Sequence, residues 1–299
     1  MFIALVQNND SGVRENGGLE KPVLKRSYII GLLVIFASIY SQYALKGLSP
    51  ILAAFVIYGI PILTTIILWG SSITRRAFNH TYTALKFGLG LFGAFTVLGM
   101  LVAAAILFII VTLDPSAANL LQRPNPALDI PPKLAWVMVW ISLFVVGPFE
   151  EYLFRGFVYG GLLSILKDRH WLSLAFVSSI LFATAHPYYA FVYGITSLVQ
   201  FTDLVAFGMA MAATYHLSGG NLLIPAMIHG TYDASEFFDV ATSSNLGASF
   251  RGYMIMASIL VAIVLFIQKM PITRVIAFLK PATRRKTEEV KQNALAGVK

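Results

Sequence analysis

Long apolar runs recur along this chain, and they constrain its fold more than any other feature. A helix needs about 20 mostly apolar residues to cross the roughly 30 Å hydrocarbon core of a bilayer. Runs of about this length, separated by short polar segments, follow one another from residue 27 to residue 268. Inside a bilayer each backbone polar group must be hydrogen-bonded within the protein, and a helix does this by itself. The predicted fold is therefore all-α: a polytopic membrane protein, with a bundle of about eight transmembrane helices enclosing a polar cavity.

The predicted spans differ in length and in regularity. They cover residues 27–45, 50–69, 87–113, 133–165, 171–187, 199–216, 221–240 and 253–268. The fourth is too long for a simple crossing, so we expect it to tilt or to project beyond the bilayer. Residues 187–200 hold Pro187, Gly194 and many aromatic residues, which predicts a re-entrant or interfacial connection. Asp203 follows shortly after, and we expect it to lie near this loop.

Composition agrees with a membrane protein and narrows the chemistry. Hydrophobic residues make up 57% of the chain and charged residues only 12%, which is more apolar surface than a water-soluble domain needs. Cysteine is absent, so thiol catalysis, thiolate metal sites and disulfides are excluded.

The basic residues are distributed unevenly between the two predicted sides of the membrane. Most of the Lys and Arg residues lie before the first span, in alternate loops, and after the last span. By the positive-inside rule both termini are cytoplasmic and the number of spans is even. The net charge of +8 follows from this topology, so we expect a lipid bilayer but no nucleic acid as a partner.

Three regions follow from this topology. They are a polar cytoplasmic N-terminal segment (1–26), a transmembrane helical domain (27–268) with a motif-bearing core at 133–240, and a basic cytoplasmic tail (269–299). The N-terminal segment lacks the short apolar core and cleavage site of a signal peptide, so the first apolar run is expected to be a retained span.

The fourth span carries charges at membrane depth. Glu150, Glu151 and Arg155 interrupt an otherwise apolar run. Such charges are costly in a membrane and usually face a bundle interior or a water-filled cavity. Glu151 and Arg155 are four residues apart, so on a helix they share a face and can pair. Glu150 is rotated by about 100° from Glu151 and is left available for another role.

Other polar residues are predicted to reach the same depth from two further spans. Glu150 and His186 lie at similar distances, roughly 24 Å, on either side of the loop at 167–170, so antiparallel neighbours would bring them level. His229 and Asp233 are spaced four residues apart, and both can face one cavity.

Each of these residues also has a structural interpretation. A buried histidine is more often a core residue than a catalyst, an Arg–Glu pair can simply hold helices together, and an aspartate at depth can cap or pack a helix. Six such residues on three spans nevertheless indicate a functional site. His80, His170 and His216 lie in predicted loops or at a span end, and we expect no catalytic role for them.

The residue types favour hydrolysis by an activated water. A glutamate in a low-dielectric cavity can act as general base, and a histidine can share the water or stabilise an oxyanion. No Ser or Cys nucleophile lies in a recognisable triad setting. A zinc ion held by Glu150, His186 and His229 is a possible alternative, although no His-Glu-x-x-His motif is present. No cofactor is otherwise indicated.

These residues carry a family resemblance. Glu150-Glu151-x-x-x-Arg155, Phe182-x-x-x-His186 and His229-x-x-x-Asp233 resemble the three motifs of the CAAX protease and bacteriocin-processing (CPBP) family, which includes the Rce1-type prenyl-protein endopeptidases. The resemblance covers about residues 133–239. It implies a helical bundle with a conical cavity, open toward cytoplasm and lipid.

The resemblance also implies roles for the matched residues. Glu150 and His186 would activate water, Glu151 and Arg155 would fix the helix and the local field, and His229 with residue 233 would stabilise the oxyanion. The Rce1-type pattern has Asn where this chain has Asp233. Because an ionised aspartate cannot donate a hydrogen bond, Asp233 is expected either to orient and charge His229 or to be kept protonated by burial.

We therefore predict an intramembrane endopeptidase of the cell (plasma) membrane. Its substrate would be a membrane-associated protein or peptide, with prenylation left open, and its catalysis either glutamate-type or metal-dependent. One alternative is a non-catalytic scaffold or bacteriocin-immunity protein of the same fold. Another is a proton-coupled transporter, but the paired repeats typical of transporters are not evident.

Overall fold

The computed structural model describes residues 25–44, 52, 55–123, 125, 128–166 and 169–267. These residues form helices and no strand. In chain order the elements are α2 (Lys25–Ala44), η1 (Phe55–Gly59), α4 (Ile60–Arg76), α5 (Thr81–Leu113), η2 (Pro115–Gln122), α6 (Pro132–Ile141), η4 (Ser142–Val146), α7 (Gly147–Glu151), η5 (Tyr152–Tyr159), α8 (Gly160–Ile165), α9 (Trp171–Thr184), α10 (Tyr188–Tyr193), η6 (Gly194–Thr196), α11 (Ser197–Leu217), α12 (Leu223–Thr242) and α13 (Leu246–Ile267).

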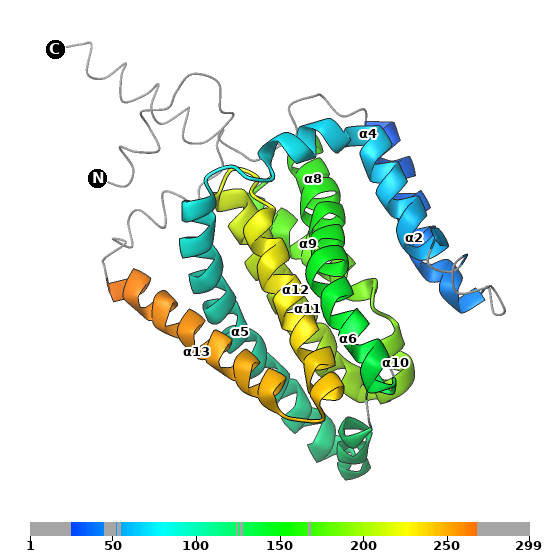
Figure 1. The fold of residues 1–299 in the computed structure, drawn as a ribbon, viewed down its shortest axis with the longest axis vertical. Coiled ribbons are helices and arrows are strands. Elements are labelled where there is room, and N and C mark those ends of the chain that lie inside the picture. The colour runs from blue at the N-terminus through cyan, green and yellow to red at the C-terminus, as the bar shows by residue number, and fades with distance from the viewer. Residues whose placement is uncertain are drawn as a thin grey trace.

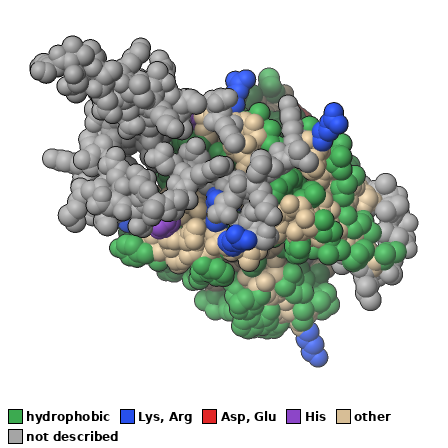
Figure 2. Space-filling view, turned by 90° about the horizontal axis from the view of Figure 1, so that it is seen from above, with side chains coloured by type: hydrophobic (Ala, Val, Ile, Leu, Met, Phe, Trp, Pro, Cys, Tyr) green, Lys and Arg blue, Asp and Glu red, His purple; other side chains and the backbone are tan. Residues whose placement is uncertain are grey.

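The long helices run side by side, with α2 and α4 at one edge of the bundle and α5 and α13 at the other (Figure 1). The continuous helix α6 to α8 and helix α12 lie between these two pairs (Figure 1). Helix α11 packs against both α5 and α9. Hydrophobic side chains cover much of the visible surface around the bundle, with a few Lys and Arg side chains projecting from it (Figure 2).

Four helical stretches are long and apolar enough to cross a membrane: Thr81–Leu113, Pro132–Ile165, Tyr188–Leu217 and Leu246–Leu265. Shorter apolar helices occupy Arg26–Ser41, Phe55–Gly70 and Trp171–Thr184. Helix α12 belongs to neither group, and it carries Asp233, Glu236 and Asp239 within its length. The predicted all-α polytopic membrane fold is confirmed, and each of the eight predicted spans corresponds to a helix.

The structure adds to two of these expectations. Residues 187–200 are almost entirely helical: α10 and η6 lead into α11, and the bend between them is at Gly194, whose φ is +55°. The prediction that Asp203 lies near a loop is wrong, because Asp203 lies inside α11, facing Gly99 of α5. The segment 1–24, most of the predicted N-terminal region, and the predicted tail at 269–299 lie outside the described residues.

An aromatic cluster joins the α2/α4 pair to the central helix. Trp69 of α4 and Tyr28 of α2 both pack on Phe157, with ring centroids 4.7 and 5.4 Å apart. The Tyr28 hydroxyl also donates a hydrogen bond to the Val158 carbonyl at 2.6 Å. Because all these side chains are buried, they hold α2 and α4 against the part of the central helix that follows the two glutamates.

The central helix is π-helical on both sides of the two glutamates. Residues Ser142–Val146 and Tyr152–Tyr159 are π-helical, and Gly147–Glu151 is α-helical between them. A π-helical turn carries an extra residue, and such turns are frequent at functional sites. Helix α12 packs along α6, η4 and α7, so the first of the two π-helical segments lies in this contact.

The crossing between the central helix and α12 depends on two glycines. A Cβ on Gly147 would lie 2.5 Å from the Gly230 backbone nitrogen, and a Cβ on Gly230 would lie 2.8 Å from the Ser142 carbonyl oxygen. With no side chain at either position, the two backbones approach closely. Glu150 follows Gly147 by three residues and His229 precedes Gly230, so this contact brings both near the crossing point.

Replacing Gly147 by Ala is expected to force these backbones apart. Overpacking of this kind costs about 1–3 kcal/mol of stability, so Gly147→Ala should lower the unfolding temperature in detergent. Gly252→Ala is the matched control, because a Cβ there meets nothing within 4 Å. Equal unfolding temperatures for the Gly147→Ala variant and the wild type would show that the crossing tolerates a wider separation.

Candidate active site

Glu151 lies at the centre of a buried charge network. Its side chain is 0% exposed and that of Arg155 is 1% exposed. Arg155 approaches Glu151 Oε1 at 2.9 Å from the next turn of the helix, which is the pairing expected from their spacing. The Arg155 guanidinium also lies 4.6 Å from the centre of the Phe182 ring, a cation–π contact. The negative charge of Glu151 is therefore compensated inside the bundle.

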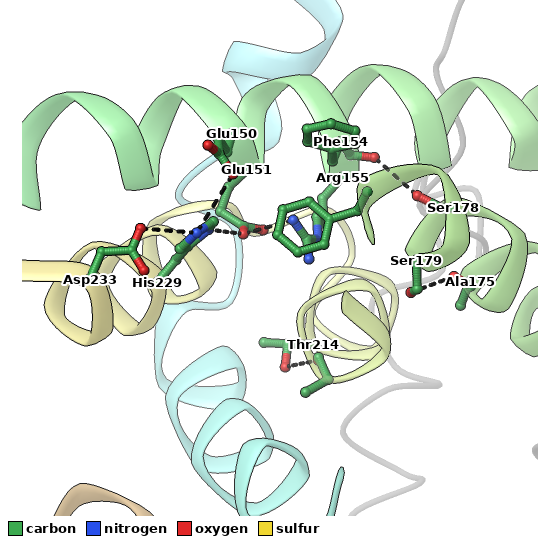
Figure 3. A network of polar contacts seen from close by, with 12 residues as sticks. Glu150, Glu151, Phe154, Arg155, Ala175, Ser178, Ser179, Thr214, His229 and Asp233 are labelled. Atoms are coloured by element: carbon green, nitrogen blue, oxygen red, sulfur yellow. Dashed lines mark hydrogen bonds and ion pairs between the residues drawn. The ribbon is translucent and has the colours of Figure 1, made fainter. Parts of the chain in front are cut away.

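The same oxygen of Glu151 orients His229. The His229 Nδ1 atom lies 2.8 Å from Glu151 Oε1. A carboxylate can only accept, so Nδ1–H is the donor. This hydrogen bond turns the other ring nitrogen, Nε2, away from Glu151. Figure 3 shows the His229 ring between Glu151 and Asp233.

Glu150 faces two histidines. Its Oε2 atom lies 3.8 Å from His186 Nε2 and 3.7 Å from His229 Nε2. These distances are too long for direct hydrogen bonds. At these distances Glu150, His186 and His229 could all contact one bound water molecule. The predicted equal depth of Glu150 and His186 agrees with this contact.

His186 is held in one orientation by its own helix. Its Nδ1 atom lies 2.9 Å from the carbonyl oxygen of Phe182, one turn earlier. Because a carbonyl only accepts, Nδ1 carries the proton and a neutral His186 presents the lone pair of Nε2 toward Glu150. The ring is partly exposed, with 23% of the side chain accessible.

Asp233 lies on the outer side of the cluster. Its Oδ2 atom is 3.5 Å from His229 Nε2, and 35% of its side chain is exposed. The expectation that Asp233 orients His229 needs correction, because the ring-orienting hydrogen bond at Nδ1 comes from Glu151. Asp233 instead adds a second negative charge, after Glu150, near Nε2. The structure thus brings all six predicted site residues into one cluster.

Two phenylalanines contact the cluster: Phe182, which the motif Phe182-x-x-x-His186 includes, and Phe207, which was not predicted. Phe182 packs against His186 and His229, with ring centroids 4.9 and 5.9 Å apart. Phe207 of α11 packs edge-on against His229 at 4.9 Å. Together they form an apolar wall beside the polar groups. In the sequence, Phe207 is one apolar residue within an apolar run, so no local signal distinguishes it.

The other three histidines lie elsewhere. His80 precedes α5 in a left-handed conformation, with φ of +44°. His170 caps α9 by accepting a hydrogen bond from the Leu172 amide at 3.2 Å. His216 stacks on Trp171 at 4.6 Å. All three are near the ends of helices.

A cavity of about 220 Å³ lies beside His186. Its wall comes from α2, α9, α10 and α11, and includes Tyr40, Tyr189, Phe201 and Leu204. It is mostly apolar and provides room next to the cluster. Within the described part of the chain, no group of three or more His, Cys, Asp or Glu side chains is arranged to hold a metal ion.

A comparison with protein-family models identifies the region that contains this cluster. Residues 132–235 match the model described as type II CAAX prenyl endopeptidase, Rce1-like. This segment is similar to the Rce1-like family. The match confirms the resemblance predicted from the three motifs, and it includes all six residues of the cluster. The Rce1-like segment implies CAAX protease activity in general, in an integral membrane protein. No curated protein and no solved structure matches the chain.

Removing Arg155 is expected to destabilise the protein. Breaking a buried pair by deleting one partner leaves an uncompensated charge and costs about 3–5 kcal/mol. Arg155→Ala should therefore lower the unfolding temperature in detergent by several degrees or more, or prevent accumulation of folded protein. Lys133→Ala, at an exposed position of α6, is the control. Unchanged unfolding of Arg155→Ala would mean that the pair does not stabilise the fold.

Proposed function

We propose that this protein is an intramembrane endopeptidase that cleaves a membrane-associated substrate with a water activated by Glu150. The observation that carries the proposal is the position of the Glu150 carboxylate, 3.7 and 3.8 Å from the Nε2 atoms of two histidines, within a Rce1-like segment. In this arrangement Glu150 is the general base, and no side-chain nucleophile is needed.

The first step is attack by water on the scissile carbonyl carbon. The bound water donates one proton toward Glu150 Oε2 and is also within reach of His186 Nε2. Its remaining hydroxide oxygen forms the new C–O bond while Glu150 takes the proton. His186 keeps the water in place, because its Nδ1–H is already committed to the Phe182 carbonyl.

The second step is collapse of the tetrahedral intermediate. When protonated, His229 Nε2–H can donate a hydrogen bond to the developing oxyanion while keeping its proton. The carboxylates of Glu151, Glu150 and Asp233 around this ring favour its positive charge. The C–N bond then breaks, and the proton held by Glu150 passes to the departing amine. The products are a carboxylic acid and an amine.

Membrane depth suggests the kind of substrate. The cluster lies roughly halfway along the central helix, so a substrate segment that already lies in or at the bilayer would be at the same depth. The apolar cavity beside His186 is consistent with an apolar or lipidated group near the cleavage site, so a prenylated CAAX protein is one candidate substrate.

Glu150→Gln is expected to abolish cleavage of a farnesylated CAAX peptide by the purified protein. The substitution removes the base but keeps the size and shape of the side chain, so a loss of about 10²–10⁴-fold in rate is expected. The unfolding temperature should stay near that of wild type. Product formation would be measured by mass spectrometry, each assay with and without a zinc chelator.

The outcomes separate the alternatives. Cleavage that survives chelation and is lost in Glu150→Gln supports the glutamate mechanism. Cleavage lost on chelation makes Glu150, His186 and His229 metal ligands instead. Wild-type rates in Glu150→Gln would contradict the role of the base. No cleavage by wild type of either the farnesylated or the unmodified peptide would favour a non-catalytic protein of this fold.

A further inference from the structure

The cavity beside His186 adjoins the proposed reaction site. His186 forms part of its wall, and the Nε2 atom of this residue lies 3.8 Å from Glu150 Oε2. The rest of the wall comes from four helices and includes Tyr40 of α2, Thr184 of α9, Ala190 of α10 and Phe201 of α11. A group held in this cavity would therefore lie next to a histidine that holds the attacking water.

Three polar residues of the wall use their hydrogen-bond donors within the protein. The Tyr40 hydroxyl donates to the Thr184 carbonyl at 2.5 Å, and the Thr184 hydroxyl donates to a carbonyl of its own helix at 2.9 Å. His186 donates from Nδ1 to the Phe182 carbonyl and presents Nε2 to Glu150. Because burying a polar group without a hydrogen-bond partner is costly, the cavity favours an apolar ligand.

The size of the cavity matches one amino-acid side chain. A cavity of about 150 Å³ lined by Leu, Ile and Phe holds a benzene molecule, and sites for drug-sized ligands usually occupy about 300–1,000 Å³. The volume of about 220 Å³ beside His186 lies between these values, so it has room for a Leu, Met or Phe side chain. A farnesyl chain has more than twice as many carbon atoms as benzene and would exceed this volume.

We propose that this cavity is a specificity subsite, which binds one large apolar side chain of a substrate residue that flanks the scissile bond. The inference rests on the proposed function, because the flanking residues are defined by cleavage at Glu150. A lipid on the substrate would then lie outside the cavity. Ala190 and Phe201 set the size of the side chain that fits, because they are a small and a large apolar residue of the same wall.

The test compares peptides that differ in one residue beside the scissile bond. Mass spectrometry locates the bond that the full-length protein cleaves in a farnesylated CAAX peptide, and each unmodified residue beside that bond is changed in turn to Ala, Leu and Phe. One methylene in a hydrophobic pocket changes kcat/KM by about 10–200-fold. Wild type should therefore favour the Leu peptide over the Ala peptide by at least about tenfold at one of these positions.

Two variants change the cavity in opposite directions. Ala190→Leu fills it, so the Leu-to-Ala ratio of kcat/KM should fall below about threefold. Phe201→Ala enlarges it, so the Phe-to-Leu ratio should rise by about tenfold. A ratio does not depend on the fraction of folded protein, so partial misfolding does not imitate either result. Ala105→Leu, at an exposed position of α5, which does not line the cavity, is the control and should keep the wild-type ratios.

An unchanged Leu-to-Ala ratio in Ala190→Leu would overturn the inference and leave the protease assignment intact. So would equal cleavage of the Ala, Leu and Phe peptides by wild type. A Phe201→Ala variant whose preference changes only with prenyl-chain length, between farnesyl and geranyl peptides, would also overturn it, because the cavity would then hold the lipid.

Binding of the same peptides to Glu150→Gln separates the two proposals, because binding needs no cleavage. Peptides that bind with the Leu preference, but that wild type does not cleave, would contradict the proposed function and support the subsite. In that case Ala190→Leu, introduced into Glu150→Gln, should remove the preference in binding. Peptides that are neither bound nor cleaved would overturn both proposals.

Discussion

The structure depends on compensating one buried carboxylate. Glu151 is fully enclosed, and a lone charge in that position would cost several kcal/mol. Arg155 and His229 both approach its Oε1 atom, at 2.9 and 2.8 Å. Arg155 lies on the same helix as Glu151, and His229 lies on α12. The contact between His229 and Glu151 therefore forms only when the two helices pack together. The interaction that stabilises the charge is therefore also the one that positions a histidine beside Glu150.

Close packing makes that interaction geometrically possible. Gly147 and Gly230 let the central helix and α12 approach backbone to backbone, just before Glu150 and just after His229. Between the two flanking π-helical segments, the short stretch that holds both glutamates is regular α-helix. Phe182 fills the space between the helices and contacts Arg155 and both histidines. A polar cluster is thus held within an otherwise apolar bundle.

Some of this arrangement could be predicted because it depends on local helix geometry. The pairing of Glu151 with Arg155 follows from a four-residue spacing. The equal depth of Glu150 and His186 follows from counting residues on both sides of one hairpin. The nature of the contact to His229 did not follow, because Glu151 and Asp233 are both carboxylates and either could have held the ring. Asp203 was misplaced because the helical continuity of the segment before it depends on packing against neighbouring helices.

The sequence by itself determined the class of fold, the helical spans and the six polar residues at membrane depth. Hydrophobic length and helical periodicity act over a few turns, so they are visible in one dimension. Only the tertiary structure decided which carboxylate orients His229 and which aromatic rings surround it. Those contacts join residues from separate helices, and their geometry depends on how closely the helices pack and on how each is rotated about its axis.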